Sequence, residues 1–222
     1  MGQSFMSAEQ DLRDSLPPLQ RLALAYAPAD ARLPTLSLLA LDTRLAGIVR
    51  NSHEPMLAQL RLAWWREQLS SDPATWPRGE PLLASLRSWQ GHEAGLVALV
   101  DAWEHITGTA ELTAPAFEGF AAGRGEAFAT LARVLDSDGD AEPARALGAA
   151  WALADLAAHL SRPEERRAVR ALVEASSSRR GKLSRRLRPL VVLHGLALRR
   201  AGDRELSVSA LLTALRLGLL GR

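Results

Sequence analysis

The spacing of apolar residues follows the period of an α-helix along almost the whole chain, and this feature most constrains the fold. Hydrophobic residues recur three and four positions apart, and no alternating strand pattern is longer than a few residues. Expected helices, bounded by Pro, Gly and polar turns, cover 19–26, 33–50, 54–69, 81–89, 93–107, 113–135, 143–160, 161–178, 189–200 and 207–220. We therefore predict an all-α, single-domain helical bundle of roughly eight to ten helices.

Composition bounds the class of protein. The 222 residues are 47% hydrophobic, enough for one sizeable core, so we expect one domain over 1–222 with 1–16 loosely ordered. No cysteine is present, which excludes disulfides, thiolate catalysis and cysteine metal sites. The first residues lack the apolar stretch of a signal peptide, and no apolar run approaches the roughly 20 residues of a membrane span. We expect a cytoplasmic protein, with peripheral membrane contact as an open alternative.

Charge is distributed unevenly along the chain. Residues 1–160 hold 12 Arg and 20 acidic residues (−8), whereas 161–222 hold 15 basic and 5 acidic residues (+10). The densest basic run is Arg179, Arg180, Lys182, Arg185, Arg186 and Arg188. Such a run can bind diphosphate or phospholipid headgroups, and the apolar segment 187–198 beside it could lie at a membrane interface. Aromatic residues are missing around the run, which disfavours nucleic-acid binding by stacking, and a solvated helical face is the alternative.

The segment 54–69, EPMLAQLRLAWWREQL, is a particularly informative helix. A proline suits its first turn, where the missing N–H is unpaired in any case. Its predicted apolar face consists of Met56, Leu57, Leu60, Trp64 and Leu69. Adjacent tryptophans point about 100° apart on a helix, so Trp64 and Trp65 cannot fill one pocket. One is expected in the core and the other against a neighbouring helix or a cavity wall.

The same segment resembles a signature of the squalene/phytoene synthase family. The matching residues are Glu54, Pro55, Leu57, Arg61, Leu62, Trp64, Trp65, Arg66, Glu67 and Leu69, with scattered support from Gly123, Arg124, Leu147 and Gly148. The similarity is greatest to a divergent branch that includes the mitochondrial complex I assembly factors of that family. This resemblance implies the isoprenoid synthase fold, a helical bundle around a central cavity.

Catalytic members of that family join two prenyl diphosphates head to head, with Mg²⁺ held by aspartate clusters on two facing helices. The first cluster belongs on the helix 33–50, where the aspartate positions fall on Ala46, Gly47 and Arg50. Asp42 stands alone, one turn too early. The alternative for Asp42 is an ion pair within the bundle, with Arg44 or a later arginine.

The second cluster belongs on the alanine-rich helix 143–160, where Asp155 is the only carboxylate of the matching stretch. His159 lies four residues later, so the two side chains can pair on one helix face. One aspartate and one histidine do not make a trinuclear magnesium site. No catalytic, metal or cofactor residue is therefore assigned, and Mg²⁺ is expected only if the chain is an active enzyme.

Two further acidic groups have simpler explanations. Asp101, Glu104 and His105 share one helix face and could bind a divalent metal, but a solvated face is favoured. The run 136–140, DSDGD, lacks the residues that complete an EF-hand calcium loop and is predicted to be a turn.

These observations favour a non-catalytic protein of the squalene/phytoene synthase type. By resemblance, its role would be protein assembly at the membrane surface with a protein partner, respiratory complex I being the suggested target. The alternatives are an active prenyltransferase of isoprenoid or carotenoid biosynthesis, or a carrier that binds a prenyl or lipid ligand. Candidate cavity and ligand-binding residues are Asp42, Trp64, Trp65, Arg66, Phe120, Arg124, Phe128 and Asp155.

Overall fold

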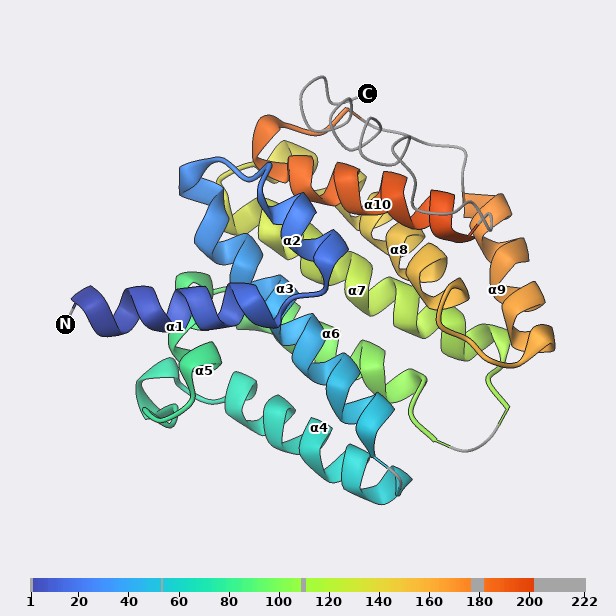
Figure 1. Ribbon diagram of the computed structural model, residues 1–222, viewed down its shortest axis with the longest axis horizontal. Coiled ribbons are helices and arrows are strands. Elements are labelled where there is room, and N and C mark those ends of the chain that lie inside the picture. Colours follow the sequence, from blue (N-terminus) through green and yellow to red (C-terminus); the bar gives the residue numbers. More distant parts are fainter. Residues whose placement is uncertain (1, 53, 109–110, 177–181, 202–222) are drawn as a thin grey trace.

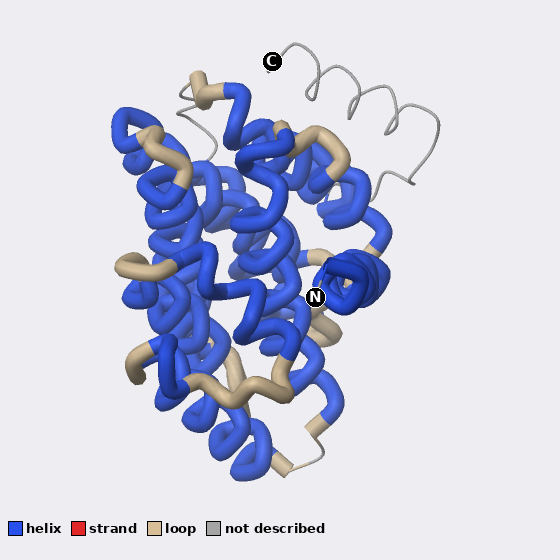
Figure 2. Tube along the Cα trace, turned by 90° about the vertical axis from the view of Figure 1, so that its left-hand side faces the viewer, coloured by secondary structure: helices blue, strands red, loops and turns tan. Residues whose placement is uncertain are grey.

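Ten α-helices and four short 3-10 helices form the secondary structure of the residues that the computed structural model describes, which are 2–52, 54–108, 111–176 and 182–201. No strand occurs in these ranges (Figures 1 and 2), so the predicted all-α class is confirmed. The α-helices are α1 (Gly2–Ser15), α2 (Pro18–Leu24), α3 (Ala29–Asn51), α4 (Pro55–Ser70), α5 (Pro81–Leu86), α6 (Glu93–His105), α7 (Ala114–Val134), α8 (Ala141–Ala157), α9 (Pro163–Ser176) and α10 (Arg188–Ala201).

Prolines mark several helix starts, as the sequence predicts. A proline occupies the first turn of α2, α4, α5 and α7, where the missing N–H breaks no intrahelical bond. The start of α3 differs from the prediction, because the helix begins at Ala29 and Pro34 lies inside it. The carbonyl of Pro34 accepts a hydrogen bond from the indole N–H of buried Trp89 at 3.1 Å, and this contact ties α3 to the short helix after α5.

Helices α6, α7 and α8 form the centre of the bundle, with α10 packed on α8 (Figure 1). Two glycines allow the close approach of these helices. A Cβ atom on Gly123 would lie 2.5 Å from the Ala98 carbonyl of α6, and one on Gly125 would lie 2.7 Å from the Arg145 carbonyl of α8. Real Cβ atoms do not come this close to backbone oxygen. Gly123 and Gly125 therefore allow α7 to contact α6 and α8 closely.

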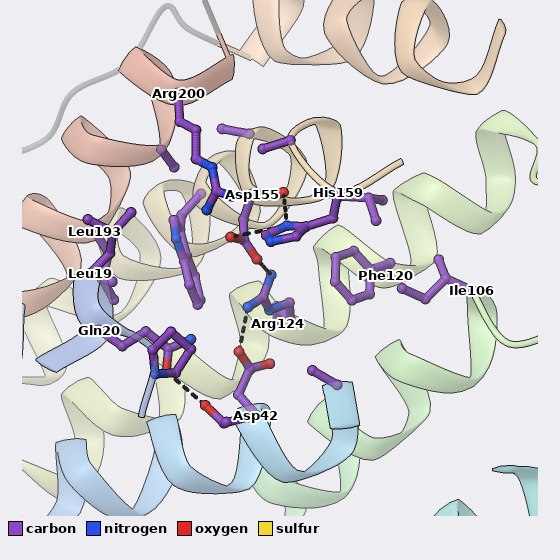
Figure 3. A pocket seen from close by; sticks show the side chains of 18 of the residues that line it. Leu19, Gln20, Asp42, Ile106, Phe120, Arg124, Asp155, His159, Leu193 and Arg200 are labelled. Carbon is purple, nitrogen blue, oxygen red and sulfur yellow. Dashed lines mark hydrogen bonds and ion pairs between the residues drawn. The ribbon is translucent and has the colours of Figure 1, made fainter. Parts of the chain in front are cut away.

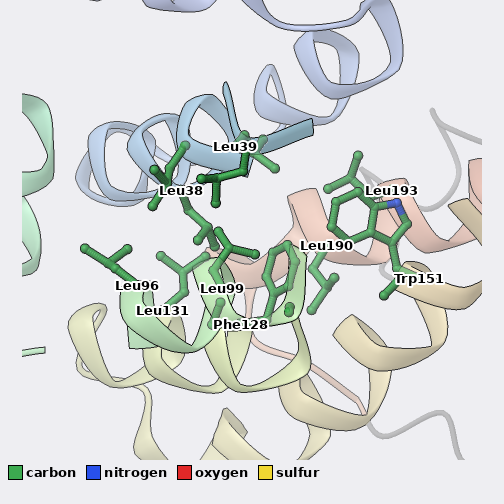
Figure 4. Packing of buried hydrophobic residues seen from close by; sticks show 14 of the residues in the cluster. Leu38, Leu39, Leu96, Leu99, Phe128, Leu131, Trp151, Leu190 and Leu193 are labelled. Atoms are coloured by element: carbon green, nitrogen blue, oxygen red, sulfur yellow. The ribbon is translucent and has the colours of Figure 1, made fainter. Parts of the chain in front are cut away.

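The hydrophobic core runs through all of these central helices. Figure 4 shows its middle, where buried side chains from five helices meet. The labelled residues are Leu38, Leu39, Leu96, Leu99, Phe128, Leu131, Trp151, Leu190 and Leu193. Helix α10 packs on α8 and buries its apolar face, including Leu190 and Leu193, in the core. The segment 187–198, considered as a membrane-interface helix, is a core helix in the structure.

Helix α4 buries a different face from the predicted one. Its buried residues are Ala58, Leu62, Trp65 and Leu69, and of the predicted face only the last is among them. Met56, Leu57, Leu60 and Trp64 are exposed. The prediction of this face was wrong because the helix carries apolar residues nearly all round, so spacing alone does not select one side. Packing against α6 and α3 makes the choice.

The N-terminal segment is more ordered than the sequence predicts. The segment expected to be loosely ordered, 1–16, contains α1, and its Leu12 and Leu16 are buried. The helix expected at 207–220 lies outside the described residues. None of the helices in the described ranges combines the length and the apolar character needed to cross a bilayer.

Candidate functional site

A cavity of about 1070 Å³ opens between α2, α3, α6, α7, α8 and α10 (Figure 3). Its walls are largely apolar side chains contributed by all of these elements. Examples are Leu19, Ile106, Phe120, Trp151 and Leu193. A polar group stands among them, and the labelled charged side chains in Figure 3 converge on it from α3, α7, α8 and α10.

The centre of this polar group is Arg124 of α7. One guanidinium nitrogen donates to Asp42 Oδ2 of α3 at 2.5 Å, and the other donates to Asp155 Oδ2 of α8 at 3.2 Å. The second oxygen of Asp42 accepts the indole N–H of Trp103 at 2.9 Å. One arginine thus bridges two carboxylates that come from different helices.

Aromatic rings enclose the guanidinium. Its central carbon lies 3.9 Å from the ring centre of Trp151, 5.0 Å from that of Phe120 and 5.6 Å from that of Trp103. A cation over an aromatic face is stabilised by the ring quadrupole, and more so when it is desolvated. The Arg124 side chain is 1% exposed, and its Nε is buried with no hydrogen-bond partner among the described residues.

Electrostatics couple these groups. Burial raises the pKa of the Asp42 carboxyl above its ordinary value of 3.8, while the charge and hydrogen bond of Arg124 and the Trp103 N–H act in the opposite direction. Burial alone would lower the pKa of Arg124, but Asp42 and Asp155 together raise it. The guanidinium therefore stays cationic, and a charged group is retained in a mainly apolar wall because two carboxylates face it.

His159 completes the polar group at the C-terminal end of α8. Its Nδ1 lies 2.8 Å from the backbone oxygen of Asp155 and 3.8 Å from Asp155 Oδ1, so the predicted i, i+4 pair forms. The imidazole is partly exposed and lines the cavity. Arg200 at the end of α10 points toward the same group (Figure 3).

The residues present do not fit the magnesium site of catalytic squalene/phytoene synthases. Of the positions where the resemblance places the first carboxylates, Ala46 and Arg50 line the cavity and offer no carboxylate oxygen. Asp42 and Asp155 do face each other from α3 and α8, but the Arg124 guanidinium lies between them. Within the described part of the chain, no three His, Asp or Glu side chains come together as a metal site would require.

The structure brings together four of the eight sequence-predicted cavity residues, and the other four lie elsewhere. Those that line the cavity are Asp42, Phe120, Arg124 and Asp155. Trp65 is in the core, Trp64 is on the surface, and Phe128 packs edge-on against Trp151 with ring centres 5.4 Å apart. Arg66 is outside the cavity because α4 packs on the outer side of α6.

Arg66 has partners of its own. It donates to Asp101 at 2.5 Å and to Glu104 at 2.6 Å, both on α6. These bonds account for two members of the acidic face considered as a metal site. The acidic turn 136–140 has a structural role too, since Asp140 accepts the Ser184 N–H at 3.1 Å.

The basic run is divided between several roles. Arg186 binds Asp30 at 2.8 Å and the Leu135 carbonyl at 2.5 Å, so it holds the start of α10 against α3 and α7. Lys182 and Arg185 are exposed, Arg188 is half-buried, and Arg179 and Arg180 lie outside the described residues.

Several cavity residues escaped sequence reasoning. Gln20 is buried and accepts a hydrogen bond from the Thr43 hydroxyl at 2.9 Å. Trp103 donates its indole N–H to Asp42, and the rings of Trp103 and Trp151 form the aromatic wall beside Arg124. The sequence signal for Gln20 is its position as a polar residue within a short apolar helix. The spacing of Trp103 and Trp151 in the sequence does not distinguish the wall of a cavity from a packed interior.

No known protein family, curated protein or solved structure matches the chain. The cavity and the ion pairs of Arg124 within it are therefore the features of the chain that bear on function.

Proposed function

We propose that this chain is a non-catalytic protein of the squalene/phytoene synthase type, whose cavity binds a prenyl or lipid chain without transforming it. One observation carries the proposal. Arg124 bridges Asp42 and Asp155, the carboxylates that α3 and α8 direct at each other, in the same cavity as Ala46 and Arg50, where the resemblance would put magnesium ligands. The resemblance in the segment 54–69 supplies the family.

The bridging arginine opposes prenyl-diphosphate chemistry. Ionising a diphosphate needs divalent metal to neutralise the leaving group. To accept metal here, the Asp42 carboxylate would have to exchange its buried guanidinium for an ion, and breaking a buried pair costs about 3–5 kcal/mol. A diphosphate without metal would meet the two carboxylates instead. An active prenyltransferase, the alternative, would require ligands that the described residues do not assemble.

The cavity itself supports ligand binding. Small-molecule sites are mostly apolar clefts of roughly 300–1,000 Å³ with a few polar groups that fix orientation. The cavity of about 1070 Å³ has this character, with apolar walls and the polar group at Arg124 and His159. A flexible apolar chain matches the walls, and a small uncharged headgroup matches the central polar group, in which Asp42 and Asp155 neutralise Arg124.

The place of the protein in the cell follows from the resemblance. In the assembly-factor branch, the family's fold serves protein assembly at a membrane surface. We extend that role to this chain, with a protein partner and with respiratory complex I as the suggested target.

Calorimetric titration with two probes tests the proposal. Farnesol presents an uncharged prenyl chain, and farnesyl diphosphate presents the same chain with a diphosphate, with and without Mg²⁺. We expect farnesol to bind, Mg²⁺ to have no effect on either probe, and no condensed product to form. The matched variants are Ala158→Trp, which fills space at the cavity wall, and Ala146→Trp, which adds the same bulk on the exposed side of α8.

The results of these titrations distinguish a non-catalytic ligand-binding protein from an active prenyltransferase. Loss of farnesol binding in Ala158→Trp, with binding kept in Ala146→Trp, supports the cavity as the site. Binding of farnesyl diphosphate that depends on Mg²⁺, or a condensed product, would overturn the non-catalytic proposal. Absence of binding by either probe would refute the carrier function and leave only the assembly role.

A further inference from the structure

Among the residues whose side-chain burial is described (7–52, 54–108, 111–176 and 182–200), all the exposed large hydrophobic side chains lie on one helix. On α4, Met56 is 71% exposed, Leu57 47%, Leu60 62% and Trp64 39%. These side chains remain exposed because α4 packs against α6 with its opposite face. Such a concentration differs from the scattered single apolar residues that are normal on a protein surface.

These four side chains form a ridge, the α4 ridge. Met56, Leu60 and Trp64 are spaced by four residues, the repeat that forms the ridges of the commonest helix–helix packing. Leu57 flanks the ridge, three residues before Leu60 and two turns before Trp64. The ring of Trp64 is held edge-on against the buried ring of Trp65, with centres 5.1 Å apart, so the ridge presents an ordered surface.

The size of the α4 ridge matches one side of a protein interface. Together the four side chains expose on the order of 400 Å², in the range of the largest apolar patch of a typical monomer. A stable interface buries about 800 Å² on each partner, of which somewhat more than half is apolar. The ridge therefore supplies nearly the whole apolar share of one such face.

Charge decides what covers the ridge. Helices that bind the membrane surface carry many Lys and Arg on their polar face. Here the charged residues of the 54–69 segment are Glu54, Arg61, Arg66 and Glu67, which sum to zero, and Arg66 is bound to α6. A neutral apolar ridge without a basic border fits protein better than an anionic bilayer.

We infer that the α4 ridge binds a second copy of this chain in an antiparallel, two-fold arrangement. A two-fold interface uses one patch twice, so the patch must complement itself. The ridge does so with Leu60 on the axis. Met56 and Trp64 lie four residues on either side, so Met56 of one copy meets Trp64 of the other, a sulfur–aromatic contact. This inference stands apart from the proposed cavity function, because α4 does not line the cavity.

Sedimentation equilibrium of the full chain tests self-association. We expect the wild-type chain to form dimers at micromolar concentration and Leu60→Asp to raise the dimer dissociation constant at least about tenfold, since two apolar contacts are lost per dimer. The control is Ala168→Asp, which adds the same charge at an exposed position of α9. A wild-type chain that stays monomeric at 100 μM, a concentration on the order of that at which weak interfaces associate, would overturn the inference.

The absence of cysteine from the chain allows a second, positional test. Leu60→Cys places one thiol beside the proposed axis, within reach of the same thiol of the second copy, and mild oxidation should link the two copies rapidly. Ala168→Cys serves as the control for random collision. Equal cross-linking rates in the two variants would refute the two-fold arrangement.

Vesicles of phosphatidylcholine and phosphatidylserine distinguish the membrane alternative. We expect no co-sedimentation of the wild-type chain with these vesicles beyond that of Leu60→Asp. Vesicle binding that is lost in Leu60→Asp, without self-association of the wild-type chain, would assign the α4 ridge to lipid and overturn the inference.

Discussion

Replacing Arg124 with methionine is predicted to be strongly destabilising. The change keeps an elongated side chain but removes the cation that faces Asp42, which is 3% exposed, and Asp155, whose side chain is 30% exposed. Asp155 can regain water, so the main cost comes from Asp42. Removing one partner of a buried ion pair costs about 3–5 kcal/mol. For a domain of this size, that lowers the melting temperature by about 6–20 °C.

The cost should depend on pH in a defined direction. Burial already raises the pKa of Asp42, and Arg124 is the main group that opposes this rise. In Arg124→Met the folded-state pKa therefore rises further above the unfolded-state value. Such a carboxyl favours folding below its unfolded-state pKa, and the benefit is lost as pH rises through the folded-state pKa. The difference in unfolding free energy between wild type and variant is expected to be largest near neutral pH and smallest in acid.

Urea denaturation followed by circular dichroism, at pH 4.5 and pH 7.5, measures both effects. Two comparisons isolate the cause. Adding Asp42→Asn to Arg124→Met should recover about 1–3 kcal/mol, because residues in one ion-pair network couple by this amount. Arg66→Met, which removes a partly exposed arginine with two carboxylate partners, should cost under about 1 kcal/mol. A loss below 1 kcal/mol in Arg124→Met, or one that does not change with pH, would refute the buried-pair argument.

Three further predictions concern the bundle. Gly125→Ala should lower the unfolding free energy by about 1–3 kcal/mol, since its Cβ would lie 2.7 Å from the Arg145 carbonyl, and thermal melting measures this. Trp89→Phe should cost about 1–3 kcal/mol in urea denaturation, because the Pro34 carbonyl loses its indole donor. Asp42→Asn should flatten the stability profile between acid and neutral pH, because the wild-type carboxyl, with its raised pKa, favours folding below its unfolded-state value and loses that benefit as pH rises.

The sequence predicts the helices well because local signals define them. Prolines and polar turns bound the helices, and their effect depends only on the residues nearby. The start of α3 at Ala29 departs from this rule, since Pro34 lies inside the helix and not in its first turn. The buried face of α4 could not be predicted, because apolar residues surround the helix and tertiary packing alone selects the side.

The candidate site was predictable in part. For Asp42 the sequence left an ion pair with Arg44 or with a later arginine as the alternative, and the structure pairs Asp42 with Arg124 and Arg44 with Glu80. The identity of that partner depends on a contact across 82 residues, which no local pattern reveals. The same applies to the aromatic wall, because Trp103 and Trp151 come together only once α6, α7 and α8 pack around the close contacts of Gly123 and Gly125.

An arginine and a magnesium ion can both neutralise two facing carboxylates, but they leave different chemistry behind. Magnesium keeps coordination positions for water and phosphate oxygens, so its site can take up a substrate and stabilise a leaving group. The guanidinium of Arg124 directs its donors at Asp42 and Asp155, and aromatic rings enclose it. Its charge is already compensated by Asp42 and Asp155, so Arg124 offers a diphosphate no open coordination position of the kind that magnesium keeps. Apart from the side chains of Arg50, His159 and Arg200, the cavity offers a ligand mainly apolar surface, and this supports a binding function over a transfer reaction.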